Sequence, residues 1–321
     1  MNDELPHTCV AVSEAAGEDM TDPRSQRARI ATETLHIIQH GAYINDQGRT
    51  VTLQPQLERC LKDTRLYRPE NFAVLPSPLP GSARCTIEVR IETTLAGARR
   101  LAGREDTGRV GVLNFASAKN PGGGFLQGSQ AQEESLARSS ALYASLQRCP
   151  DYYTFHRHTS RTLLYSDHII YSPGCPVFRD DEGRLLSESY QVDFITAPAP
   201  NRKALTRNEP ERLPEIGSVL TRRCGRILQA AAAQGSDTLV LGAWGCGVFG
   251  NDPAEVAEAF AEHLLSQRQF RDVFRHICFS IPEHRSGIGN AAAFKRHFDR
   301  ERVAPGSHQG RVDRTSALRQ V

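Results

Sequence analysis

The stretch that decides the fold is NFASAKNPGGGFLQGSQAQEE, residues 114–134. It starts at the end of an apolar strand, passes through three consecutive glycines at 122–124, and ends on Gln-Glu-Glu at 132–134, where a helix-forming run begins. Glycines without a Cβ let the backbone lie against a ligand, and carboxylates that face such a loop can transfer protons or hold hydroxyl groups. The stretch therefore predicts a strand, a ligand-binding loop and a helix that presents two candidate catalytic acids.

Each part of this stretch also has a plainer reading. Three glycines alone are typical of a flexible turn, and acidic residues are common in the first turn of a helix because they stabilise its positive end. Neither reading explains why a backbone-exposing loop comes directly before two carboxylates. Ser129 and Gln132 also fit a capping box, which would fix the start of the helix.

A second glycine-rich loop follows another strand. Residues 241–253, LGAWGCGVFGNDP, leave a predicted strand and enter a helix, with Asp252 suited to the N-cap and Pro253 to the first helical position. Exposed backbone N–H groups beside the positive end of a helix are the ingredients of a phosphate-binding site. A tight structural turn is the alternative interpretation of this loop.

Strands and helices alternate along the rest of the chain. We expect strands at residues 86–91, 109–115, 168–171, 192–197, 237–242 and 276–281, and helices at 94–102, 132–146, 214–233, 253–265 and 289–297. This alternation favours a central sheet with helices on both faces. Ligands of such sheets bind beyond the strand ends, so both glycine loops can contribute to one crevice.

The first eighty residues have a different pattern. They predict an amphipathic helix at 25–40, a hairpin at 43–53 and a second helix at 57–67, followed by a proline-rich connector. The polar ends of the chain predict flexible tails. We expect four parts: a disordered tail at 1–24, an N-terminal, mainly helical accessory region at 25–80, a catalytic domain at 81–300 and a flexible tail at 301–321.

Composition excludes several classes of protein. Hydrophobic residues make up 39% of the chain, charged residues 24%, and the formal net charge of +2 gives no general reason for binding to nucleic acid or membranes. The eight cysteines are scattered, without the spacing of a zinc site. No leader pattern and no membrane-spanning run is visible. We expect a cytoplasmic monomer that uses no cofactor and no metal.

The three glycines, the short spacer and Gln-Glu-Glu together resemble the signature of poly(ADP-ribose) glycohydrolases. The second loop resembles the diphosphate-binding loop of macrodomains, the fold on which that family is built. Residues 166–174 (SDHIIYSPG) and 196–201 (TAPAPN) resemble stretches of the microbial branch. The resemblance runs from about residue 25 to about residue 300, and it implies an α/β fold, a macrodomain-like α/β/α sandwich with a mixed central sheet.

The resemblance implies a hydrolase that cleaves the ribose–ribose O-glycosidic bonds of poly(ADP-ribose) on modified proteins and releases ADP-ribose. It implies that Glu134 is the general acid and base, that Glu133 holds ribose hydroxyls, and that Asn120 bonds to the same ribose. Neighbouring helical residues point about 100° apart, so these two glutamates cannot flank a sugar as an ordinary glycosidase pair does. The remaining implied substrate-binding residues are Gly122, Gly123, Gly124, Gln132, Gly245, Cys246, Gly247, Val248, Phe249, Gly250 and Asn251.

Several interpretations stay open. The enzyme could hydrolyse single ADP-ribose units on protein or nucleic acid, or the chain could be a non-catalytic ADP-ribose-binding macrodomain. Phe249 fits an aromatic that packs on a sugar or base, and equally an ordinary core residue. We interpret Cys246 as a small residue rather than a nucleophile, and His156 and His158 as structural or surface residues.

Overall fold

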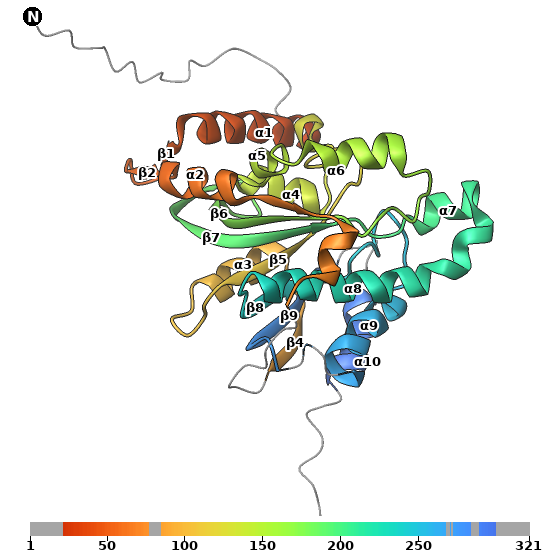
Figure 1. The fold of residues 1–321 in the computed structure, drawn as a ribbon. Helices are drawn as coiled ribbons and strands as arrows, with labels where there is room; N and C mark the ends of the chain where they lie inside the picture. The colour runs from red at the N-terminus through yellow and green to blue at the C-terminus, as the bar shows by residue number, and fades with distance from the viewer. Residues whose placement is uncertain (1–21, 77–84, 268–269, 271, 284–288, 300–321) are drawn as a thin grey trace, which may run out of the picture.

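The structure is a computed structural model that describes residues 22–76, 85–267, 270, 272–283 and 289–299 (Figure 1). Its strands are β1 (Ala42–Ile44), β2 (Thr50–Thr52), β3 (Arg65–Tyr67), β4 (Thr86–Arg90), β5 (Val110–Phe115), β6 (Ile169–Arg179), β7 (Leu185–Ala197), β8 (Thr238–Leu241) and β9 (His276–Ser280). Its α-helices are α1 (Pro23–His40), α2 (Gln54–Asp63), α3 (Thr94–Ala102), α4 (Gln132–Ser139), α5 (Leu142–Leu146), α6 (Pro150–Thr154), α7 (Arg202–Asn208), α8 (Ile216–Ala233), α9 (Pro253–Ala261) and α10 (Asn290–Phe298).

Seven strands form one mixed central sheet in the order β3-β6-β7-β5-β8-β9-β4. The pairs β7–β5, β5–β8, β8–β9 and β9–β4 are parallel, whereas β6 runs antiparallel to both β7 and β3. Helices cover both faces, with α4 and α5 on one side and α8, α9 and α10 on the other (Figure 1). The predicted α/β/α sandwich with a mixed sheet is confirmed.

The central strand β5 positions the first glycine loop. Its buried run from Val110 to Asn114 is paired on both sides by parallel strands, β7 and β8. Carboxyl ends of parallel neighbours lie at the same edge of a sheet, so the loops after β5, β7 and β8 meet there. The indole N–H of Trp244, in the loop after β8, donates to the carbonyl of Ala197 at the end of β7 (3.0 Å).

The N-terminal region is built into the main sheet. Helix α1 begins at Pro23, because the Asp22 carboxylate accepts from the N–H groups of Arg24 and Ser25, so the predicted disordered tail is wrong for its last residues. The predicted hairpin is confirmed as β1 and β2. The predicted helix at 57–67 is wrong beyond Asp63, where the chain turns and β3 pairs with β6. The predicted tail at 301–321 lies outside the described residues.

Two further expectations need correction. The predicted helix at 132–146 is broken at Ser140, whose backbone is extended (φ −150°, ψ 177°). There the Ser140 hydroxyl donates to the Leu136 carbonyl (2.7 Å) and accepts from the Leu142 N–H (3.2 Å), so the side chain replaces the helical hydrogen bonds. Strands β6 and β7 are longer than predicted, since Pro173 and Gly174 form a bulge inside β6 instead of ending it.

No helix in the described part of the chain is long and apolar enough to cross a membrane.

Candidate active site

The triple-glycine loop is a set of tight turns that only glycine fits well. Gly122 (φ +67°) and Gly123 (φ +60°) both adopt left-handed backbone conformations. A Cβ on Gly123 would lie 2.4 Å from Oε1 of Glu134, and one on Gly124 would lie 2.5 Å from Oγ of Ser129. The loop backbone therefore lies against the carboxylate of Glu134, as the sequence predicts.

Glu133 is a buried carboxyl group held by the end of β5. Its side chain is 3% exposed; Oε2 accepts from the Ser117 N–H (2.6 Å) and Oε1 accepts from the Asn114 amide (3.2 Å). Burial raises the pKa of Glu133 to about 8, and the neighbouring charge of Glu134 adds to this. The hydrogen bonds from Ser117 and Asn114 oppose the rise but do not cancel it. At neutral pH this carboxyl group is mostly protonated.

Glu134 occupies a different environment from its neighbour. It is half-buried, and its Oε1 accepts from the Gly124 N–H (3.0 Å). Its Oε2 makes no hydrogen bond within the described residues. One oxygen is thus fixed by the glycine loop while the other is available to a ligand. The two glutamates differ in burial and in partners, as separate chemical roles require.

Gln132 locks the helix start to the sheet. Its Nε2 donates to the Leu113 carbonyl (2.7 Å) and to Oγ1 of Thr94 (3.2 Å), and its Oε1 accepts from the Phe115 N–H (2.9 Å). The helix does begin at Gln132, but the predicted capping box with Ser129 is wrong: α4 has Ala131 as its N-cap and no side-chain cap. The amide of Gln132 is therefore engaged by protein groups in this structure.

Asn120 is exposed at the start of the loop. Its N–H donates to Oγ of Ser117 (3.1 Å) and its carbonyl accepts from the Gly123 N–H (3.0 Å). The side-chain amide makes no hydrogen bond within the described residues, so it remains open to a ligand.

The second glycine loop joins β8 to α9, and the side chain of Asn251 stabilises it. This buried side chain donates to the carbonyls of Pro200 (2.9 Å) and Gly245 (3.2 Å). Gly245 (φ +73°) lies so close that a Cβ would come within 2.4 Å of Ala199. The N–H groups at positions 247–249 have no hydrogen-bond partner in the described structure. The predicted caps are confirmed, since the Asp252 side chain accepts from Ala254 N and Pro253 opens α9.

The remaining residues of this loop divide between core and surface. Val248 is 72% exposed. Phe249 is half-buried and packs against the main core, with its ring centroid 6.1 Å from that of Tyr165. Burial raises the pKa of the Cys246 thiol to about 12, which keeps it protonated and supports its interpretation as a small packing residue. Gly250 (φ +71°) packs closely against Lys203.

The two predicted structural histidines behave as expected. His158 is exposed, and His156 is buried, with Nδ1 donating to the Tyr152 carbonyl (2.8 Å). Nε2 of His156 is 2.8 Å from Oγ of Ser166, which is also 2.8 Å from Nδ1 of His168. Burial lowers the pKa of His156 to about 4, so its ring is neutral and Nε2 accepts a hydrogen bond from the Ser166 hydroxyl.

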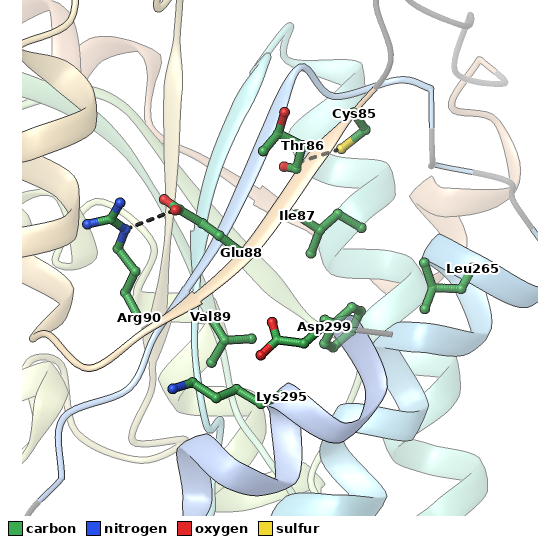
Figure 2. Close-up of a pocket in the computed structure, with 10 residues that line it drawn as sticks. Cys85, Thr86, Ile87, Glu88, Val89, Arg90, Leu265, Lys295 and Asp299 are labelled. Atoms are coloured by element: carbon green, nitrogen blue, oxygen red, sulfur yellow. Dashed lines mark hydrogen bonds and ion pairs between the residues drawn. The ribbon is translucent and has the colours of Figure 1, made fainter. Parts of the chain in front are cut away.

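A separate cavity of about 500 Å³ lies along the sheet edge at β4 (Figure 2). Strand β4 forms one wall, Leu265, Lys295 and Asp299 line the other side, and the Arg90–Glu88 ion pair lies at one end. None of the sequence-predicted site residues lines it. Among the residues that the structure describes, no group of three or more His, Cys, Asp or Glu side chains could hold a metal ion. The residues predicted from the sequence lie instead at the two glycine loops.

Sequence reasoning missed several residues that shape the site. Asn114 is fully buried and donates to both Glu133 and Thr196 (3.2 Å each). A polar residue at the end of an otherwise apolar strand was the available signal. Arg223 is also fully buried and donates to the carbonyl of Pro198 (2.6 Å) and the carboxylate of Asp167 (3.0 Å), and nothing in its helical pattern singles it out.

Fold and site together define an α/β/α enzyme in which two unlike carboxyl groups lie beside a backbone-lined loop. A family model described as "Microbial-type PARG, catalytic domain" matches residues 31–180. The poly(ADP-ribose) glycohydrolase (PARG) of Thermomonospora curvata is 51% identical, with a TM-score of 0.81, over 86% of this chain and 100% of that chain. The structure of that enzyme bound to the inhibitor ADP-HPD is 52% identical, with a TM-score of 0.80, over 86% of this chain and 100% of that chain.

The poly(ADP-ribose) glycohydrolase of Deinococcus radiodurans, solved in complex with ADP-ribose, is 44% identical, with a TM-score of 0.71, over 77% of this chain and 98% of that chain. A comparison with curated protein sequences gives no match. The chain belongs to the microbial-type poly(ADP-ribose) glycohydrolases, hydrolases of poly(ADP-ribose), and the resemblance drawn from its motifs is confirmed.

Proposed function

We propose that this enzyme releases ADP-ribose from poly(ADP-ribose), with Glu134 as the general acid and then the base for water. The observation that supports Glu134 most is its divided environment. One carboxylate oxygen is fixed by the Gly124 N–H, and the other is free of protein hydrogen bonds in the described structure. A group that protonates a leaving oxygen must be held in place and still reach the substrate.

Glu133 and Asn120 would hold the ribose. A mostly protonated Glu133 can donate a hydrogen bond as well as accept one, which suits a sugar hydroxyl. The open side-chain amide of Asn120 lies at the start of the same loop. Gln132 would act through the two glutamates, since its amide bonds to β5 and Thr94.

The second loop would hold the diphosphate of ADP-ribose. Three consecutive N–H groups at 247–249 are unpartnered in the described structure and lie before the N-terminus of α9. Backbone donors and a helix dipole together favour an anion. The T. curvata and D. radiodurans enzymes, solved with ADP-HPD and with ADP-ribose, support a ligand of this class here. Phe249 would pack on the ligand from beside this loop.

The test is release of ADP-ribose from purified poly(ADP-ribose) by wild type and by Glu134→Gln. The glutamine keeps the shape of the side chain but cannot act as a carboxylic acid. We expect release by wild type, a loss of at least a hundredfold in the variant, and retained binding of ADP-ribose. Binding without release by either protein would point to a mono-ADP-ribose hydrolase or a binding module, and conjugates with single ADP-ribose units would separate these two.

A further inference from the structure

Three arginines bind three consecutive backbone carbonyls at the end of the triple-glycine loop. Arg24 Nε donates to the Gln127 carbonyl (2.9 Å) and Arg27 Nε donates to the Gly128 carbonyl (2.8 Å), both from α1. Arg138 Nη1 donates to the Ser129 carbonyl (2.7 Å) from α4. A helix about a hundred residues earlier in the chain thus binds the loop that leads into the catalytic helix.

The contact between α1 and this loop is close enough to require glycine. Gly128 has a left-handed backbone (φ +72°), and a Cβ there would lie 2.0 Å from the carbonyl oxygen of Arg24. Phe125, from the 3₁₀ turn Phe125–Gln127, packs in a small cluster with Ala31 of α1 and Ala137 of α4. Apolar packing and hydrogen bonds therefore fix the same interface.

The three arginine side chains bring positive charge to this interface. None of the three arginines has an ion pair with a carboxylate within the described residues. Arg138 is buried, and burial together with the charge of Arg27 lowers its pKa to about 10. A buried cation without a carboxylate partner costs solvation free energy, which applies to Arg138, whereas Arg24 is exposed and Arg27 is half-buried. Among the described residues, the side chains of Arg24 and Arg27 donate only to loop carbonyls, which indicates that holding the loop is their use. Arg138 donates in addition to the side chains of Gln130 and Ser135.

A short chain of hydrogen bonds links these carbonyls to the acid. The Ser129 N–H donates to the Gly124 carbonyl (3.1 Å), and the Gly124 N–H donates to Oε1 of Glu134 (3.0 Å). The shape of the segment between Gly124 and Ser129 thus decides where Gly124 directs its N–H. Movement of Gln127 or Gly128 would move the group that orients Glu134.

We propose that α1 is part of the catalytic machinery and that Arg24 and Arg27 are positioning residues, which hold the triple-glycine loop in the shape that orients Glu134. This inference rests on the proposed role of Glu134. It predicts a defect in turnover rather than in substrate binding, because α1 packs on the turn Phe125–Gln127 and on α4, whereas the second glycine loop follows β8.

The experiment compares wild type, the double variant Arg24→Ala/Arg27→Ala, and the control Arg29→Ala in steady-state release of ADP-ribose from poly(ADP-ribose). Arg29 is exposed on the same helix and makes no hydrogen bond within the described residues. We expect kcat of the double variant to fall about ten- to a hundredfold with KM within about threefold, and the control to match wild type. Restoring longer donors with Arg24→Lys/Arg27→Lys is expected to recover part of kcat.

Hydrogen exchange provides a second readout that does not depend on activity. We expect amides at 122–131 to exchange faster in the double variant, and those at 242–252 to remain unchanged. If kcat stays within twofold of wild type in a folded double variant, or if KM alone rises, the inference is wrong. If the double variant fails to bind ADP-ribose or to unfold cooperatively, the same criteria apply to the two single variants. If wild type itself releases no ADP-ribose, the proposed function fails, while the exchange result still tests the loop contact.

Discussion

The buried carboxyl of Glu133 makes the stability of this protein depend on pH. Burial raises its pKa to about 8, against an ordinary value of 4.5. Between these two values the folded protein keeps the proton while the unfolded chain loses it. The unfolded state therefore binds fewer protons, and the free energy of unfolding falls as pH rises through this window. This contribution is fully present below pH 4.5 and is lost by about pH 8.

The size of the effect follows from the width of the window. Each pH unit corresponds to about 1.4 kcal/mol, so the full window gives about 5 kcal/mol as an upper value. The pKa of about 8 already includes the opposing hydrogen bonds from Ser117 and Asn114, so we expect most of this change in stability between about pH 5 and about pH 8. Glu133→Gln removes this titration. Its amide N–H₂ faces another donor, which costs about 1–3 kcal/mol at every pH.

Urea unfolding of wild type and Glu133→Gln at about pH 5, 7 and 9 measures this directly. We expect the variant to have a lower free energy of unfolding than wild type at the lowest pH. This difference should become smaller as pH rises. Glu105→Gln serves as the control, because Glu105 is exposed and makes no hydrogen bond or ion pair within the described residues. If the difference in the free energy of unfolding between wild type and Glu133→Gln stays constant within about 0.5 kcal/mol at all three pH values, the reasoning is refuted.

Four further substitutions separate the fold from the chemistry. Gly123→Ala adds a Cβ 2.4 Å from Glu134 at a left-handed position, so we expect kcat to fall more than tenfold and stability by about 1–2 kcal/mol. Gly217→Ala, where the added Cβ meets nothing within 4 Å, should instead stabilise its helix by about 0.5–1 kcal/mol in urea unfolding. The Cβ added by Gly247→Ala also meets no protein atom within 4 Å, so stability should be unchanged. The same Cβ would crowd a diphosphate bound at this loop, so calorimetry should show weaker binding of ADP-ribose. Ser140→Ala leaves buried backbone groups unpaired and should cost about 1–3 kcal/mol of stability with activity retained.

Local patterns predicted much of the fold and the position of the site. Alternating strands and helices gave the sandwich because each element carries its own periodicity, and the caps of α9 were readable from Asp252 and Pro253 alone. The break at Ser140 was missed although its side-chain hydrogen bonds are local, because it also places the Ala141 N–H on the carbonyl of Pro176, far along the chain. The bulge at Gly174 was missed because its partner is distant too. Gly174 N–H donates to Asp193, nineteen positions along the chain.

In the candidate site, too, the local features could be predicted from the sequence and the contacts between distant residues could not. The pair Glu133 and Glu134 could be found from spacing, since a loop and a helix start are local features. The unequal environments of the two glutamates could not be predicted from the sequence, because Asn114 and Ser117 contact Glu133 only after β5 and α4 have packed. The arginines of α1 could not be found either, since no pattern between residues 24 and 27 reveals a partner a hundred positions away.

The three-residue strand β3 protects an edge. Strand β6 runs from Ile169 to Arg179 and is buried along most of its length, and β3 pairs with its first residues. An unpaired edge of this kind is a template for strands of other molecules. A chain shortened to begin after residue 76 would lose β3 as well as α1. We expect such a protein to self-associate, which light scattering would detect, so the N-terminal region also acts as a guard against aggregation.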